Sequence, residues 1–372
     1  MRNFLNRLGK INKMSLTAKE NKEILDELDS CNRPLYFFHD DTDGLCSFLL
    51  FYRYKKEGKG ICVKAQPILN DRFQKIVEDY VPDKIFVLDI PNLDQDFVDT
   101  VVKELKIPII WIDHHTPQKI SGVKYYNPRK KDIDNNIPAA KLCYDVVVQD
   151  PERKKDLWIA AVGFIGDWTI QPGLDELAKQ YPGLVSPRIK RPEKALFDTK
   201  ISEVIRIMNF ILKGNTRGVM KCVKVLTRIE SPYELLEPTT PPAKFVIRRY
   251  NVVNKIYQDM LSDALDKFRK EKSKLLVYVY ESGQLSMSGD LSNELLYNFP
   301  KNVMIIGRIK NGEVKMSLRS GIKTKKIPPI LKKALIGVEG YGGGHEYACG
   351  SCVKEKDFDK FLASIKEQVD AK

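Results

Sequence analysis

The sequence predicts an α/β protein in which a parallel sheet, covered by helices on both faces, is followed by a helical connector and a smaller α/β domain. The first 190 residues alternate short apolar runs with amphipathic stretches, as parallel sheets wrapped by helices do. Between 191 and 272 the strand pattern stops, and Asn251–Lys272 is a long charged helical pattern. Short strand patterns then resume. We therefore expect three segments, at 1–190, 191–272 and 273–372.

The elements follow from apolar runs and their spacing. Four strands are expected in the first segment, at Leu35–Phe38, Ile61–Ile68, Lys84–Leu88 and Pro108–Ile112. Helical spacing is found at Cys46–Lys56, Arg72–Glu78, Asp96–Leu105 and Trp158–Trp168. In the last segment we expect a strand at Leu275–Tyr280, a helix around Asn293–Tyr297 and a closing helix at Asp357–Val369. The strands Asn302–Lys310 and Val314–Leu318 flank Asn311-Gly312, a strong hairpin signal.

Length, composition and charge limit the class of protein. A chain of 372 residues with 43% hydrophobic residues can bury two cores. The 62 Lys and Arg residues exceed the 49 Asp and Glu residues, and the formal net charge of +13 favours a nucleic-acid or phosphate-rich partner.

The cysteines and the apolar runs indicate a cytoplasmic protein with no membrane contact. Seven cysteines without framework spacing are typical of reduced core thiols. Cys349 and Cys352 form a lone CxxC pair, which we interpret as packed at a strand end rather than as a zinc site. No apolar run reaches the ~18 residues of a membrane span. Met1–Met14 is basic but has no apolar signal core.

Carboxylates and imidazoles follow the predicted strands of the first segment. His39-Asp40-Asp41-Thr42-Asp43-Gly44 follows the first strand, Asp89 the third, and Asp113-His114-His115 the fourth, while the Trp158–Trp168 helix ends in Gly166 and Asp167. Because ligands gather beyond the carboxyl ends of parallel strands, we expect these side chains to meet in one cleft. An isolated Asp-x-Asp is usually a solvated turn, but here each set follows a strand.

So much negative charge in one cleft repels itself unless cations lie among the carboxylates. Oxygen and imidazole donors suit Mn²⁺, with Mg²⁺ as the alternative. Two such ions about 3.5–4 Å apart can activate a water and hold a phosphate during in-line displacement. The sequence thus predicts phosphoester chemistry, with one histidine of the His114-His115 pair as a ligand and its neighbour available to phosphate.

The last segment contains a second set of polar residues. In Glu339–Gly350, successive glycines expose backbone donors beside His345. Arg319 ends a predicted strand and is suited to a bidentate phosphate contact. A flexible turn and an ordinary surface cation are the structural alternatives for these two features.

Taken in order, these motifs resemble the DHH phosphoesterase superfamily with a DHHA1-type second domain. The matching stretches are HDDTDG at 39–44, LDIPN at 88–92, WIDHHTP at 111–117, GDW at 166–168, MSLRS at 316–320 and GYGGGH at 340–345. His39 resembles archaeal RecJ-like nucleases, because bacterial RecJ has an aspartate there and carries an oligonucleotide-binding fold not found in this sequence. Residues 191–272 contain no recognised motif.

The resemblance implies a role for each matching residue. His39 and Asp41 would hold one manganese ion, Asp43, His114 and Asp167 a second, and Asp89 would bridge the two. His115 would contact the scissile phosphate, and Asp113 would orient the imidazoles, so that Asp113, His114 and His115 form the catalytic triplet. Arg319, Gly343, Gly344 and His345 would bind the substrate.

We therefore expect a metal-dependent phosphodiesterase, a single-strand-specific exonuclease that releases mononucleotides from DNA or RNA. One alternative keeps the chemistry but acts on nanoRNA, cyclic dinucleotides or 3′-phosphoadenosine 5′-phosphate. Another is a non-catalytic replication scaffold, because the superfamily includes a helicase subunit that has lost its metal ligands. Association with replication or repair proteins is left open by the sequence.

Overall fold

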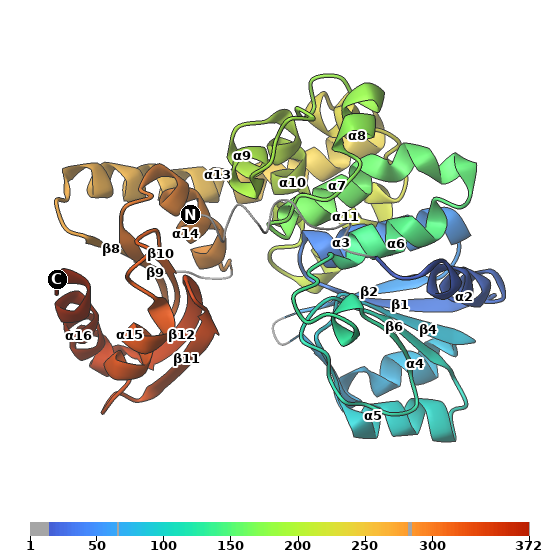
Figure 1. The fold of residues 1–372 in the computed structure, drawn as a ribbon, viewed down its shortest axis with the longest axis horizontal. Coiled ribbons are helices and arrows are strands. Elements are labelled where there is room, and N and C mark those ends of the chain that lie inside the picture. The colour runs from blue at the N-terminus through green and yellow to red at the C-terminus, as the bar shows by residue number, and fades with distance from the viewer. Residues whose placement is uncertain (1–14, 65–66, 282–284, 372) are drawn as a thin grey trace. The chain divides into compact units, whose positions relative to one another are not determined.

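The computed structural model describes residues 15–64, 67–281 and 285–371, which belong to two compact units divided between Tyr250 and Asn251 (Figure 1). The division falls inside the long helix α13, Pro241–Lys270, within the segment expected to be helical. The stretch Met1–Met14, considered above for a signal sequence, lies outside the described residues.

The first unit is built on a parallel sheet, as predicted, with the four expected strands and a fifth, β7, at one edge. Its strands are β1 Pro34–His39, β2 Lys59–Val63, β4 Lys84–Leu88, β6 Ile109–Ile112 and β7 Lys124–Tyr126. They lie in the order β2-β1-β4-β6-β7, and every neighbouring pair is parallel. The chain moves from β1 to β2 on one side and then to β4 on the other. The carboxyl ends of β1 and β4 therefore form the switch point where ligands of such sheets bind.

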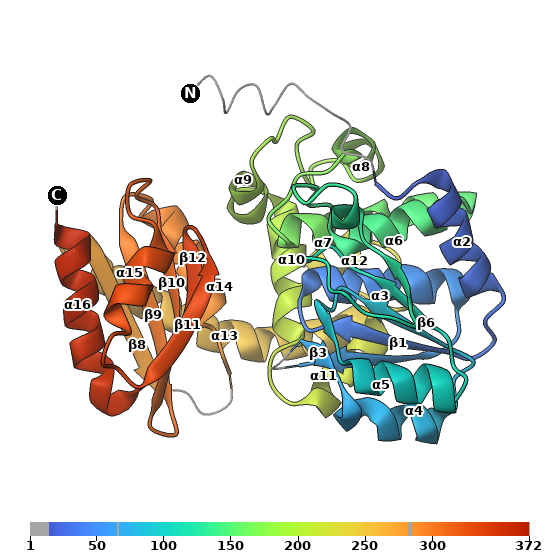
Figure 2. The same ribbon diagram turned by 60° about the horizontal axis from the view of Figure 1, so that its bottom comes forward.

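Helices cover both faces of this sheet, because β1 is apolar on both sides. Leu35 and Phe37 belong to a core shared with α4, Gln74–Tyr80, and α5, Gln95–Asp99. On the other face, the ring of Phe38 stacks 4.9 Å from that of Phe48 in α3, Thr42–Lys55. Figures 1 and 2 show α3 on one side of the sheet and α4 and α5 on the other. Each such buried side chain contributes about 1.5–3 kcal/mol.

Two predicted elements differ in detail. The expected strand Ile61–Ile68 ends at Val63, and a separate short strand β3, Ile68–Leu69, pairs with β5, Asn92–Leu93. β2 ends where its partner β1 ends, because Val63 pairs with His39, the last residue of β1. Pro67, just before β3, cannot donate to a strand ladder. The helix expected at 96–105 is α5 followed by a π-helical turn, Thr100–Glu104.

The first unit has further helices besides α3, α4 and α5. They are α2 Ala18–Asp29, α6 Ala139–Val147, α7 Leu157–Gly166, α8 Leu174–Gln180, α9 Pro192–Phe197, α10 Lys200–Ile211, α11 Thr216–Leu226 and α12 Pro232–Leu236. Arg53 of α3 joins this helical part to the sheet. Its Nε donates to Asp156 (2.9 Å), and its other nitrogens donate to the carbonyl of Ile229 and to Glu230 (both 2.8 Å).

The second unit is the expected smaller α/β domain. Its strands are β8 Leu275–Glu281, β9 Val303–Lys310, β10 Glu313–Ser320, β11 Gly340–His345 and β12 Ala348–Lys354, in the order β11-β12-β10-β9-β8. Its helices are α14 Ser288–Asn298, α15 Ile327–Ala334 and α16 Phe358–Asp370. The predicted hairpin is present, and Asn311 and Gly312 both have positive φ (54° and 70°), as a tight two-residue turn requires.

All seven cysteines are free and buried. Cys349 and Cys352 lie three residues apart on β12, so their side chains point to opposite faces of the sheet. The pair is therefore packed, as interpreted, and cannot hold one metal ion together. Among the residues described, no helix has both the length and the apolar character needed to cross a membrane.

We predict that Arg53→Ala lowers the free energy of unfolding of the first unit by about 1.5–3 kcal/mol, because buried Asp156 loses one of its two arginine partners and keeps Arg153. All three tryptophans lie in this unit, so their fluorescence during denaturant unfolding measures the change. Lys22→Ala, which removes the exposed Lys22–Asp26 pair, is the control and should cost less than about 1 kcal/mol. Equal losses in the two variants would contradict the anchoring role.

Candidate metal centre

The turn after β1 brings His39 and Asp41 together. Asp41 caps α3 by accepting a hydrogen bond from the amide of Gly44 (2.9 Å), and its other carboxylate oxygen lies 2.8 Å from Nδ1 of His39. A Cβ on Gly44 would lie 2.6 Å from the backbone N and O of His39. Glycine is therefore required for the helix to begin this close to the strand end.

Asp89 lies at the centre of the cluster, immediately after β4. Its Oδ2 is 3.5 Å from Nδ1 of His39, and its Oδ1 is 3.3 Å from Nε2 of His114. The residue is 1% exposed, yet neither carboxylate oxygen accepts a hydrogen bond from any described residue. Its φ of +58° adds backbone strain of about 1–3 kcal/mol. Such a carboxylate is stable only beside positive charge.

His114 is oriented by Asn136, which the sequence did not single out. Asn136 Oδ1 lies 2.9 Å from Nδ1 of the imidazole. This contact uses Nδ1 as a donor, so Nε2 is the ring nitrogen that can bind a cation once its proton leaves. That Nε2 faces three carboxylates, at 3.3 Å (Asp89), 3.7 Å (Asp43) and 3.8 Å (Asp167). This is the arrangement of a metal-binding histidine.

His115 is oriented by Asp113. Its Nδ1 lies 2.7 Å from Oδ1 of Asp113, and its backbone amide donates to Oδ2 of the same carboxylate (3.0 Å). Asn127, a further residue not singled out in the sequence, donates to Asp113 (3.2 Å) and to the carbonyl of His115 (3.0 Å). Asp113 thus contacts His115, whereas Asn136 serves His114. Nε2 of His115 is the ring nitrogen left to face a ligand.

Asp43 and Asp167 come to the cluster from two helices. Asp43, in the first turn of α3, accepts hydrogen bonds from the amides of Ala139 (2.7 Å) and Ala140 (2.9 Å), which open α6. Asp167 directly follows α7. A Cβ on Gly166 would lie 2.2 Å from Oγ1 of Thr42. The glycine therefore allows α7 to end against the start of α3.

The protonation of the cluster reflects this crowding. Burial and the charge of Asp89 raise the pKa of Asp43 well above its usual value. Burial raises the pKa of Asp167 to about 7, although His114 opposes the shift. Burial also disfavours ionisation of Asp89, but the His114 and His39 imidazoles hold its pKa below the usual value. Without metal, protons on carboxylates and imidazoles therefore supply the compensating charge.

The residues fit divalent cations. Two groups, His39 with Asp41 and Asp89, and Asp89 with His114 and His115, each offer ligand atoms within 4.8 Å of one another. Asp89 belongs to both groups, and no described residue donates a hydrogen bond to its two buried oxygens. Mixed carboxylate and imidazole donors suit Mn²⁺ or Mg²⁺. His115 already uses Nδ1 for Asp113. We therefore consider Asp43 and Asp167 better candidates than His115 for completing the second group.

The second unit contains the residues expected to bind substrate. Arg319 is half-buried in β10, where its guanidinium donates to Asn293 (2.9 Å) and to its neighbour's carbonyl (3.0 Å), and burial lowers its pKa. Gly343, Gly344 and His345 lie on the exposed edge strand β11. Gly344 has φ +147°, and a Cβ there would lie 2.6 Å from the carbonyl of Ala348. Their role in substrate binding remains a prediction.

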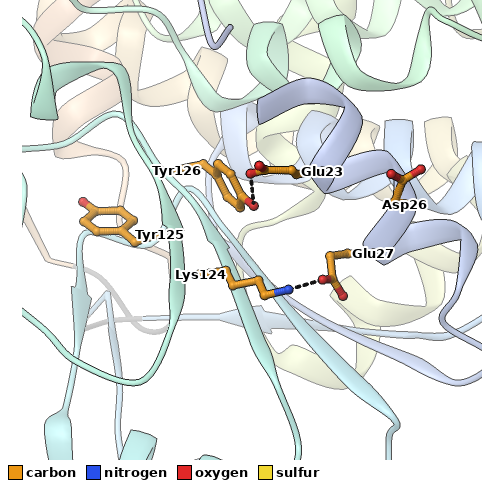
Figure 3. A pocket seen from close by; sticks show the side chains of 6 residues that line it. All are labelled: Glu23, Asp26, Glu27, Lys124, Tyr125 and Tyr126. Atoms are coloured by element: carbon orange, nitrogen blue, oxygen red, sulfur yellow. Dashed lines mark hydrogen bonds and ion pairs between the residues drawn. The ribbon is translucent and has the colours of Figure 1, made fainter. Parts of the chain in front are cut away.

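A pocket of about 570 Å³ is separate from this cluster. It lies between α2 and β7 and is lined by Glu23, Asp26, Glu27, Lys124, Tyr125 and Tyr126 (Figure 3). Glu27 pairs with Lys124 and Lys84, and Asp26 pairs with Lys22. Because Glu27 and Asp26 have cationic partners, this pocket differs from the candidate metal centre, where the carboxylates crowd together.

The fold and the cluster define an α/β protein with a candidate metal site of carboxylates and imidazoles at the switch point of a parallel sheet. Residues 35–163 match the DHH family, N-terminal domain, and residues 252–371 match the DHHA1 domain. The chain belongs to the DHH family of phosphoesterases, with a DHHA1 domain as its second unit. No curated protein matches the chain.

Solved structures share the fold at low identity. RecJ from Thermus thermophilus with Mn²⁺ is 17% identical, with a TM-score of 0.65 over 96% of this chain and 55% of that chain. The same enzyme with Mg²⁺ is 16% identical, with a TM-score of 0.59 over 96% and 53%. An exonuclease RecJ bound to manganese is 17% identical, with a TM-score of 0.58 over 97% and 96%. The chain thus spans about half the length of the Thermus enzyme.

We predict that Asn136→Ala weakens Mn²⁺ binding by about 10- to 100-fold, because His114 loses the partner that fixes its tautomer and orientation. Isothermal titration calorimetry of the full chain measures this without any substrate. Asn136→Asp keeps an acceptor oxygen at the same place and should retain most of the affinity. If the alanine variant bound Mn²⁺ as tightly as the wild type, Asn136 would not position a ligand.

Proposed function

We propose that this protein is a metal-dependent phosphodiesterase that trims single-stranded nucleic acid from an end and releases mononucleotides. The observation that carries the proposal is the buried Asp89 carboxylate between His39 and His114, whose oxygens accept no hydrogen bond from the part of the chain that the structure describes. Such a group is suited to bridging two cations, and a pair of cations in this setting is suited to phosphoester hydrolysis.

Each residue of the cluster has a distinct task in this proposal. His39, Asp41, Asp43, Asp89, His114 and Asp167 would hold the ions. When bound, the ions supply Lewis acidity toward a phosphate and a hydroxide nucleophile at neutral pH. His115, held through its Nδ1 by Asp113, presents Nε2 to a non-bridging phosphate oxygen. Asn136 orients the imidazole of His114. Asn127 donates to Asp113 and to the carbonyl of His115, and so supports the orientation of His115.

A polymeric substrate is favoured by charge. The net charge of +13 attracts a nucleic-acid chain far more strongly than a dinucleotide. The fold shared with RecJ exonucleases solved with Mn²⁺ or Mg²⁺ is consistent with this substrate class and with these ions. If the enzyme acts instead on short oligonucleotides, cleavage of a length series will be fastest at two to four nucleotides and insensitive to salt.

A non-catalytic scaffold is the alternative from another class. A scaffold of this superfamily is expected to have lost ligands, whereas here His39, Asp41, Asp43, Asp89, His114 and Asp167 all carry donor groups and lie together. The cluster also carries strain and buried charge that a scaffold would not need. These features favour an enzyme, and association with replication or repair proteins is compatible with it.

We expect Asp89→Asn and His114→Ala to abolish cleavage of 5′- and 3′-labelled DNA and RNA oligomers in Mn²⁺ while circular dichroism remains native. Asp40→Asn is the matched control. Asp40 belongs to the same turn, and its Oδ1 lies 3.7 Å from Nε2 of His39. Removing the Asp40 charge should lower the cleavage rate by less than about tenfold. Near-wild-type turnover of Asp89→Asn would remove this site from the reaction.

For the second unit, we expect His345→Ala to raise KM severalfold and to leave kcat within about twofold. His345 lies on an exposed edge strand. A side chain that binds the substrate away from the reacting bond stabilises the ground state and the transition state equally. Steady-state cleavage of a labelled oligomer gives both constants. Ile336→Ala, at a highly exposed position of the same unit, should change neither. An unaltered KM for His345→Ala would exclude this residue from the substrate contacts.

A further inference from the structure

Trp168 differs from the other two tryptophans of the protein. Trp111 and Trp158 are 0% and 1% exposed and belong to the core, whereas Trp168 is 42% exposed. It directly follows Asp167, whose Oδ2 lies 3.8 Å from Nε2 of His114. A large aromatic side chain thus lies at solvent, one residue from the candidate metal centre.

The backbone at Trp168 is one that glycine would adopt more easily. Its φ is +58°, and hydrogen bonds from the amides of Trp168 to Ile165 (2.9 Å) and of Thr169 to Phe164 (3.0 Å) fix this reversal at the end of α7. A non-glycine residue in this region costs about 1 kcal/mol or more. Trp168 is not part of the buried core, so core packing does not explain the strain.

A second aromatic ring lies next to Trp168, and exposed cations precede the helix that carries this ring. The ring of Phe197, at the end of α9, is 6.1 Å from that of Trp168, and α9 packs against α7. Just before α9, Arg188 and Lys190 are exposed, and no ion pair with a described residue involves their side chains. The segment from Arg188 to Phe197 contains no motif of the family, so the metal chemistry does not account for it.

We propose that Trp168, supported by Phe197, is a base-stacking platform for the nucleotide next to the scissile phosphate, and that Arg188 and Lys190 contact the phosphates that follow. This inference rests on the proposed function, and it identifies the base next to the scissile phosphate as the part of the substrate that is bound outside the metal centre. Aromatic side chains bind single strands by stacking on bases without regard to sequence, and nearby cations neutralise the backbone. A substrate without a base, such as an inorganic or sugar phosphate, would gain nothing from this platform.

Intrinsic fluorescence tests the contact directly. Because Trp111 and Trp158 are buried, Trp168 accounts for nearly all the emission that an oligonucleotide can quench. We expect titration of the full chain with oligo(dT) in EDTA and low salt, where no cleavage occurs, to quench wild-type emission in a saturable way. Trp168→Phe, which keeps an aromatic ring, should bind similarly in fluorescence anisotropy of a labelled oligomer but show no such quenching. Saturable binding with equal quenching in the two proteins overturns the proposal.

Abasic nucleotides provide a second, independent test. A series of oligomers with one abasic site moved stepwise from each end should show one position at which wild-type KM in Mn²⁺ rises about 5- to 100-fold. Trp168→Ala should raise KM for the intact oligomer by a similar factor and be insensitive to the abasic site at that position, while Trp168→Phe stays close to wild type. If the variant and the abasic site raised KM by independent factors that multiply, the ring of Trp168 would not touch the base.

The phosphate contacts have their own readout. Arg188→Gln and Lys190→Gln should each reduce the slope of log affinity against log salt by about 0.7, the value for one phosphate of a single strand. Glu193→Gln, a change on α9 itself, should not reduce it. Unchanged slopes in the two cation variants would exclude this part of the proposal. Absence of all cleavage by the wild type would instead count against the proposed function, so the two failures are distinguishable.

Discussion

The structure depends on one buried carboxylate, that of Asp89, which lies between two imidazoles and has no hydrogen-bond donor among the described residues. Two like charges about 4 Å apart repel by about 4 kcal/mol at an effective dielectric constant near 20, and Asp43 and Asp167 face the same imidazole. The fold must therefore hold these groups together against their repulsion. It does so with rigid elements, because Asp89 follows a central strand and its amide continues the ladder to Ile112.

Glycines and helix ends allow the carboxylates and imidazoles of the cluster to lie this close together. Gly44 lets α3 begin on the backbone of His39, and Gly166 lets α7 end against Thr42. The first amides of α6 donate to Asp43, so a helix N-terminus offsets part of its charge. Three helices that are separate in sequence are thus fixed around one strand end. The geometry of the donors is set before any cation arrives, which lowers the entropic cost of binding one.

The sequence predicted the features that depend on local pattern. Apolar runs such as Leu35–Phe38 identified the parallel strands, and Asn311-Gly312 identified the hairpin, because a strand buried on both faces and a turn with two positive φ angles allow few residues. The expectation that polar loops meet follows from the topology of parallel sheets. Asn136 and Asn127 were missed, because an asparagine in a polar loop has the same local pattern whether it orients a histidine or faces solvent. The three-residue edge strand β7 was too short to give a pattern.

A metal centre alone cannot distinguish among phosphoesters, because its ligands contact only phosphate oxygens and the attacking water. Selection among substrates must therefore come from side chains that reach the parts of the substrate flanking the reacting bond. Trp168 directly follows Asp167, and its ring lies near that of Phe197. The exposed strand β11 with His345 belongs to the second unit. Changes in these residues can alter the class of substrate while the buried cluster stays intact. The strain at Trp168 is then the energetic cost of presenting an aromatic ring where the backbone alone would favour glycine.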